Sequence, residues 1–75
     1  MTPRTKHQGH WYEASATSAG PNGTKWQGEV TIGEFGPNGH DVVLLSGFLV
    51  PGYFDTEPEA RNAAATYARE YLDRL

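Results

Sequence analysis

Two segments in the first half of the chain alternate between apolar and polar positions, which is the pattern of a half-buried β-strand. In residues 10–18, one face carries Tyr12, Ala14 and Ala16, and the other carries Trp11, Glu13, Ser15 and Thr17. In residues 25–34, the face made of Trp26, Gly28, Val30 and Ile32 opposes the polar side chains of Lys25, Gln27, Glu29 and Thr31. We therefore predict two β-strands, with Trp26 in the core.

A third strand is predicted over residues 40–46, where both faces are apolar: Val42 and Leu44 on one, Val43 and Leu45 on the other. The tetrapeptide Gly-Pro-Asn-Gly occurs at 20–23 and again at 36–39, between successive strands. Proline, asparagine and glycine suit the successive positions of a tight turn. Residues 46–47 form a kink, bulge or turn, and residues 48–54 continue as a short fourth strand or an extended arm. Because Pro51 cannot donate to a ladder, such a strand lies at an edge.

The C-terminal segment is predicted to be a helix. Thr56 and Glu59 form a capping box, in which each side chain reaches the backbone amide of the other residue. The apolar residues after it follow the helical period as one stripe: Ala60, Ala63, Ala64, Tyr67, Ala68, Tyr71, Leu72 and Leu75. We expect the alanine end of this stripe to approach the sheet closely, over Trp26 or Phe54.

These elements predict an α+β fold, an antiparallel meander of three strands, or four with residues 48–54, and one C-terminal helix packed on one face. Residues 1–9 are polar and lack a period, so we expect a flexible tail. Residues 10–75 then form a single β-β-β(-β)-α domain, since 75 residues leave no room for a second one.

One helix covers one face of such a sheet, and the other face stays open. Depending on the phase of the strands, the open face carries Trp11 or Tyr12, together with Val43 and Leu45 or with Val42 and Leu44. An exposed apolar patch on so small a domain is typical of an interaction surface. The sequence leaves three alternatives for what buries this open face: the chain's own arm or tail, a second copy of the chain, or a foreign partner. The candidate interaction surface is Trp11, Tyr12, Val43 and Leu45.

Composition and charge narrow the classes of function. The chain has a net charge of −3, and residues 10–75 hold four basic and nine acidic residues, so the expected folded body carries −5. This acidic body argues against binding to a phosphate backbone. No apolar run is long enough for a membrane span, and no apolar stretch follows the basic residues near the N-terminus. Together with the absence of cysteine, this favours a cytoplasmic protein.

No catalytic, cofactor-binding or metal-binding residues are predicted. The spacing of His7, His10 and His40 fits no common metal site, and a meander places another strand between His10 and His40. The two glycine-rich turns do not lead into a helix N-terminus, as a phosphate cradle requires. We therefore expect a protein that is not an enzyme.

Two stretches resemble a known family. Lys25-Trp26-x-x-Glu29-Val30, followed by Phe54-Asp55-Thr56-x-x-Glu59-Ala60 and Ala64, is similar to the AP2-type DNA-binding domain and its integrase relatives. The resemblance implies a three-stranded antiparallel sheet on a C-terminal helix, with the sheet reading DNA. The chain also resembles small conserved bacterial proteins in which a sheet precedes an F-x-T-x-x-E-A helix, and that resemblance implies no assigned activity.

Two functional hypotheses follow. The first is a non-enzymatic domain for protein interaction or self-association through the open sheet face. The alternative is a nucleic-acid-binding domain, AP2-like or a sheet that stacks single-stranded bases on Trp11 or Tyr12. In the alternative, Arg4, Lys6 and Lys25 would supply positive charge.

Overall fold

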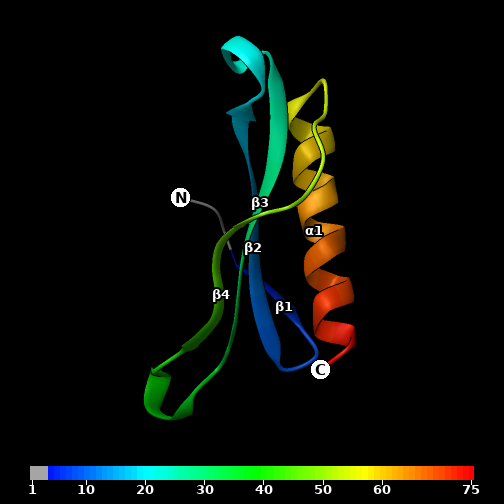
Figure 1. The fold of residues 1–75 in the computed structure, drawn as a ribbon. Helices are drawn as coiled ribbons and strands as arrows, with labels where there is room; N and C mark the ends of the chain where they lie inside the picture. The colour runs from blue at the N-terminus through cyan, green and yellow to red at the C-terminus, as the bar shows by residue number, and fades with distance from the viewer. Residues whose placement is uncertain (1–3) are drawn as a thin grey trace.

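The computed structural model describes residues 4–75 as a four-stranded antiparallel sheet with one helix on one face (Figure 1). The strands are β1 (Thr5–His7), β2 (His10–Ala19), β3 (Lys25–Glu34) and β4 (Val42–Leu49), and the helix is α1 (Glu57–Asp73). Strand order in the sheet follows chain order, β1-β2-β3-β4. The predicted α+β meander with a C-terminal helix is confirmed, and the sheet has four strands.

The fourth strand comes from the N-terminal side rather than from residues 48–54. The tail predicted over residues 1–9 is wrong for residues 5–7, which form β1 and pair with the start of β2; residues 1–3 lie outside the described part of the chain. Gln8 and Gly9 both have positive φ, at 50° and 80°, as a two-residue hairpin turn requires. At the end of this hairpin, His7 Nε2 lies 2.9 Å from Asp73 Oδ1 of α1.

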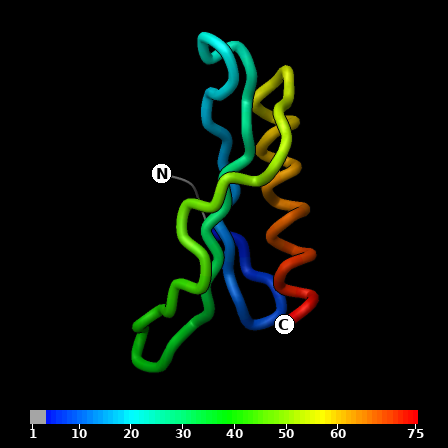
Figure 2. Tube along the Cα trace, in the orientation of Figure 1, coloured from blue at the N-terminus to red at the C-terminus, as the bar shows by residue number. Residues whose placement is uncertain are grey.

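Residues 48–54 divide between two structures. Phe48 and Leu49 are the end of β4, whereas Phe54 forms an isolated bridge with Trp26. Both backbone hydrogen bonds of this bridge measure 2.8 Å. The segment between them crosses from the β4 edge of the sheet to the start of α1, as the tube in Figure 2 shows.

Both Gly-Pro-Asn-Gly segments form the predicted tight turns. They fold as short 3₁₀ turns, η1 (Pro21–Gly23) and η2 (Pro37–Gly39), at opposite ends of the molecule (Figure 1). Asn22 and Asn38 take left-handed φ values of 57° and 59°. Asparagine and glycine tolerate this conformation better than other residues, which explains the repeated use of the same tetrapeptide.

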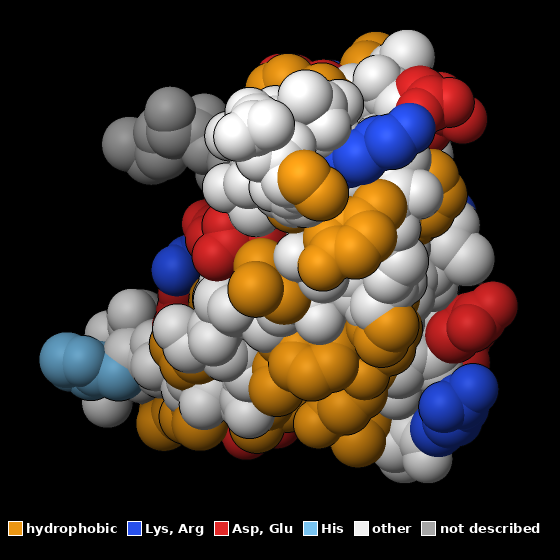
Figure 3. Space-filling model, turned by 45° about the horizontal axis from the view of Figure 1, so that its top comes forward, with side chains coloured by type: hydrophobic (Ala, Val, Ile, Leu, Met, Phe, Trp, Pro, Cys, Tyr) orange, Lys and Arg blue, Asp and Glu red, His pale blue; other side chains and the backbone are white. Residues whose placement is uncertain are grey.

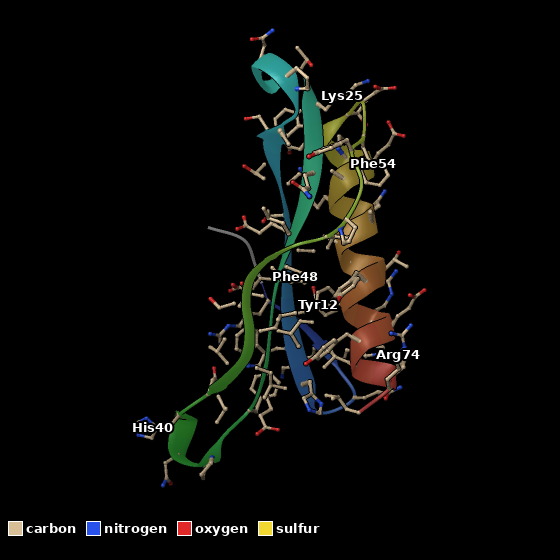
Figure 4. All side chains as sticks on the ribbon, viewed as in Figure 1. Tyr12, Lys25, His40, Phe48, Phe54 and Arg74 are labelled. Carbon is tan, nitrogen blue, oxygen red and sulfur yellow. The ribbon has the colours of Figure 1, made fainter. Side chains whose placement is uncertain are left out.

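Helix α1 begins at the predicted N-cap, Thr56, although the Glu59 carboxylate contacts the Thr56 hydroxyl rather than the Thr56 amide. The Thr56 hydroxyl accepts a hydrogen bond from the Glu59 amide at 3.4 Å and donates to Glu59 Oε1 at 2.8 Å. The helix presents a fully buried stripe to the sheet, made of Ala60, Ala64, Ala68 and Leu72. The core between the two layers consists of Tyr12, Val30, Ile32, Val50, Ala64, Ala68 and Leu72. Figure 4 shows Tyr12 between the sheet and the helix.

The helix approaches the sheet most closely at Gly28 of β3. A Cβ atom at this position would lie 2.7 Å from the Ala60 carbonyl oxygen and 3.1 Å from Ala64 Cβ. The predicted close approach of the alanine end therefore exists, but over Gly28. Trp26 lies on the same strand beyond this contact and is only partly buried, so its predicted place in the core is wrong.

Strand β4 is bent by two β-bulges. It pairs with β3 through Val30↔Phe48, Ile32↔Leu45 and Gly33↔Val43, with register shifts between these pairs. In each shift β4 holds one extra residue, around Gly47 and at Leu44 respectively. Gly47 has φ 59°, which fits a bulge at this place. Because a bulge turns the strand, the simple alternation of faces predicted for residues 40–46 does not hold along β4.

Candidate interaction surface

Trp11 does not lie on an open surface. Only 1% of its surface is exposed, and its ring lies so close to Gly33 that a Cβ atom there would overlap it. The Arg4 guanidinium stacks over the ring at 3.9 Å from the centroid. Arg4 is held there by Asp41 and by Glu13, whose carboxylate lies 3.6 Å from Nε. The N-terminal segment therefore covers Trp11, as one of the alternatives left open by the sequence allowed, and Trp11 is not part of an exposed surface.

Tyr12 is buried on the other side of the sheet. It is 6% exposed and packs in the core beneath α1, where Arg69 Nη1 donates to its hydroxyl oxygen at 3.3 Å. Tyr12 shares its face with Ile32, directly opposite on β3 and fully buried. Of the two phases left open for this strand, the one that places Tyr12 under the helix is therefore the one found, and Tyr12 does not belong to the open face.

Val43 and Leu45 lie in different surroundings. Val43 is 52% exposed, whereas Leu45 is partly buried and packs against the core. The bulge at Leu44 separates the partners of these residues, Gly33 and Ile32, which are neighbours on β3 with opposite faces. The four predicted surface residues therefore do not form one patch: Val43 is exposed, and the other three contact the interior.

Exposed apolar side chains concentrate instead along β4. Val42, Val43, Leu44 and Leu49 are between 39% and 52% exposed, and we call these four residues the β4 surface. Phe35, 46% exposed, follows the end of β3. No residue from Val42 to Leu49 is charged. The space-filling view shows hydrophobic side chains gathered in the middle and lower part of the face turned to the viewer (Figure 3).

Sequence reasoning found part of the β4 surface. The sequence indicated exposed apolar side chains here because residues 42–45 are apolar on both faces of the predicted strand. Val42 and Leu44 were predicted on the open face only in the alternative phase of the strand. Leu49 was missed, because the strand was expected to end at Ser46. Its continuation to Leu49 depends on the bulge around Gly47, and the Ser46-Gly47 pair alone is equally compatible with a turn.

The helix side of β4 is partly closed by aromatic side chains. The rings of Phe48 and Tyr67 stack with their centroids 5.1 Å apart, and Tyr67 stacks on Tyr71 at 6.5 Å. These contacts fasten β4 to α1 at the Phe48 end of the strand. The other end, toward His40, runs away from the helix (Figure 4).

The three cationic side chains predicted to supply charge for nucleic-acid binding contact other side chains of the same molecule. Arg4 contacts two carboxylates, Lys25 pairs with Asp55, and the Lys6 ammonium lies 5.7 Å from the centroid of the Phe35 ring. With Trp11 and Tyr12 buried, the aromatic rings expected to stack bases are not accessible. The described sheet therefore lacks the exposed Trp11 or Tyr12 ring on which the nucleic-acid-binding hypothesis depended.

Lys25 lowers the pKa of Asp55 below its ordinary value, through its hydrogen bond first and its charge second. Any stabilisation from this pair is present above the ordinary pKa and is lost as the pH falls through the lowered one. The pair is exposed and screened by solvent.

In a Lys25→Met variant, we expect a carboxyl-carbon NMR titration to show a higher pKa for Asp55. Lys6→Met is the control that should leave it unchanged; the same pKa in all three proteins would contradict the pairing.

Among residues 4–75, no three side chains of histidine, aspartate or glutamate come together as a metal site. His7 contacts Asp73, His10 lies 3.7 Å from Glu34, and His40 stands at the tip of the β3–β4 hairpin. No helix in the described chain is long and apolar enough to cross a membrane.

Comparison of the chain with protein-family models, with curated proteins and with solved structures gives no match in any of the three.

Proposed function

We propose that this protein is a non-enzymatic interaction module that self-associates through β4. The observation that carries the proposal is the exposure of four large apolar side chains on one uncharged strand at the edge of the sheet. An edge strand offers unpaired backbone groups, and proteins usually protect such edges with charges or proline. On the opposite edge, β1 is only three residues long and includes Lys6, and the part of β2 that β1 leaves unpaired carries Glu13 and small side chains rather than large apolar ones.

The apolar pattern of β4 also favours a partner. A strand that is apolar on both faces is typical of the interior of a sheet, where other layers or strands cover it. Here Val42 and Val43, neighbours with opposite faces, are both about half exposed. Pairing with a further strand would give β4 the central position that its side chains suit.

The shape of β4 favours a second copy as that partner. The bulges bend the strand, so an incoming straight strand would not follow it. Leu44 and Gly47 lie at equal distances from the middle of Val42–Leu49. A copy related by a two-fold axis through this middle presents Gly47 opposite Leu44, so that bulge meets bulge. Because the strand is uncharged, no like charges meet across the contact.

Light scattering and sedimentation velocity over a range of concentrations test the proposal. We expect the apparent mass to rise above the 8.2 kDa of one chain as concentration increases. Leu44→Lys places two like charges at the contact and removes apolar area, so we expect the dissociation constant to rise about tenfold. Asn62→Lys adds the same charge on the exposed surface of α1 and serves as the control.

Two results would overturn self-association through β4. One is a monomer at every concentration, with all three proteins folded by circular dichroism. The other is an oligomer that Leu44→Lys and Asn62→Lys weaken equally, since this would locate the contact elsewhere.

A further inference from the structure

The two Asn-Gly pairs of the chain lie in identical tetrapeptides but are held differently. In η1, the Gly23 amide donates to the Gly20 carbonyl oxygen at 3.1 Å. In η2, the backbone hydrogen bonds found in residues 4–75 include no equivalent bond from Gly39 to Gly36. The first residues of the two turns also differ in conformation: Gly20 has φ 78°, whereas Gly36 is extended with φ −92° and ψ 174°.

The residue after each turn increases this difference. Thr24 donates twice to the Pro21 carbonyl oxygen, from its amide at 3.2 Å and from its hydroxyl at 2.9 Å. His40, at the equivalent place in η2, makes one such bond, from its amide to Pro37 at 3.1 Å. Turn η1 is therefore closed by three hydrogen bonds and η2 by one.

We propose that Asn38 is a site of spontaneous deamidation and that the hydrogen bonds of η1 protect Asn22 from the same reaction. The backbone nitrogen of Gly39 loses its proton and attacks the side-chain Cγ of Asn38. A new N–C bond forms, the bond from Cγ to the amide nitrogen breaks, and ammonia leaves with the proton. Water then opens the resulting succinimide at either carbonyl and yields aspartate or isoaspartate, without an oxidant or a reductant.

The exposure of Asn38 and the lack of a side chain on Gly39 favour this reaction once the turn opens. Gly39 has no side chain to shield the attacking nitrogen, and apart from Gly39 and its two neighbours in the chain no residue lies within 4 Å of the place where a Cβ would be. Asn38 is exposed and holds a left-handed conformation, so the turn must open before Gly39 can approach Cγ. Opening η1 requires the loss of three hydrogen bonds, including the one made by the nucleophile Gly23.

Deamidation at Asn38 would add a negative charge four residues before β4. Isoaspartate also lengthens the backbone by one carbon, which does not fit the left-handed position in the turn. The modification would therefore alter the β3–β4 hairpin, whose tip projects away from the helix (Figure 4).

Peptide mapping of the purified full chain tests the inference directly. Trypsin separates the two asparagines, because Asn22 falls in the peptide 7–25 and Asn38 in the peptide 26–61. The protein is incubated at mildly alkaline pH, folded in buffer and unfolded in urea, and isoaspartate in each peptide is followed by mass spectrometry. The unfolded sample gives the intrinsic rate of each site.

We expect the ratio of the Asn38 rate to the Asn22 rate to be about thirtyfold higher in the folded protein than in urea, because η1 has two more closing hydrogen bonds than η2 and each contributes a net of about 1 kcal/mol. A Thr24→Val variant removes one bond from η1 and should raise the Asn22 rate while leaving the Asn38 rate unchanged. Equal rate ratios in the folded and unfolded samples, or faster reaction at Asn22 in the fold, would overturn the inference.

Discussion

Replacing Trp11 by alanine is expected to cost about 3–5 kcal/mol of the free energy of unfolding, the usual loss for a buried tryptophan. A domain of this size has a total stability of about 5 kcal/mol, so the variant should be largely unfolded. The reason is that the Trp11 ring fills the space that Gly33 leaves empty on β3 and lies beneath Arg4. Trp26→Ala should cost roughly 1–2 kcal/mol, because that ring is only partly buried.

Fluorescence of single-tryptophan variants keeps this prediction testable if Trp11→Ala does not fold. Trp11→Phe retains an aromatic ring over Gly33 and should fold with a smaller loss. Its emission then comes from Trp26 alone, and we expect it to be quenched readily by iodide. Trp26→Phe leaves Trp11 as the emitter, which should resist quenching at 1% exposure. The reverse order of quenching would contradict the burial of Trp11 and would support the place in the core that the sequence predicts for Trp26.

The features that local sequence determines were predicted well. The N-cap at Thr56 and the spacing of the helix stripe as far as Leu72 depend on residues within a few positions of one another, and α1 follows both. The strand β3 begins and ends at the predicted residues 25 and 34, because alternation and the flanking Gly-Pro-Asn-Gly turns mark both ends. The buried residues Val30 and Ile32 lie on its predicted helix face.

The features that depend on distant contacts were predicted poorly. Strand β1 is three residues long and polar, and it forms by pairing with β2 rather than by any periodicity of its own. Without β1, Arg4 had no reason to lie over Trp11, and the open sheet face appeared to carry an exposed aromatic ring. Alternation identifies the two faces of a strand, but it does not show what other segments cover each face.

Alternation also failed to assign the faces of β4, where the exposed residues differ from those predicted. The apolar residues of the strand are visible in the sequence, but their directions depend on the bulges at Leu44 and around Gly47. A bulge shifts every following side chain to the other face, so strict alternation assigned Leu45 to the open face with Val43. The structure turns Leu45 toward the core and leaves Leu44 exposed instead.

Gly28→Val is expected to separate the helix from the sheet at their closest contact. The Ala60 carbonyl oxygen, 2.7 Å from the place of a Cβ, belongs to the helix backbone and cannot rotate away as a side chain does. Either α1 or β3 must therefore move, and we expect a loss of about 1–3 kcal/mol from overpacking. Urea unfolding measures the loss. Ser15→Val, a substitution on the opposite face of the sheet, should change stability by about 0.5 kcal/mol or less.

A double-mutant cycle measures the energetic coupling between Gly28 and Ala64 at this contact. Ala64 Cβ lies 3.1 Å from the place of a Cβ on residue 28, so Ala64→Gly removes one of the three nearest obstructing atoms, and the only one in a side chain. Alone, Ala64→Gly should destabilise the helix by about 1 kcal/mol. Combined with Gly28→Ala it should cost less than the sum of the two single changes, because the smaller helix residue makes room for the new methyl group. Strict additivity of the two losses would mean that Gly28 and Ala64 do not touch, and the packing of α1 on β3 would then have to be different from the one described here.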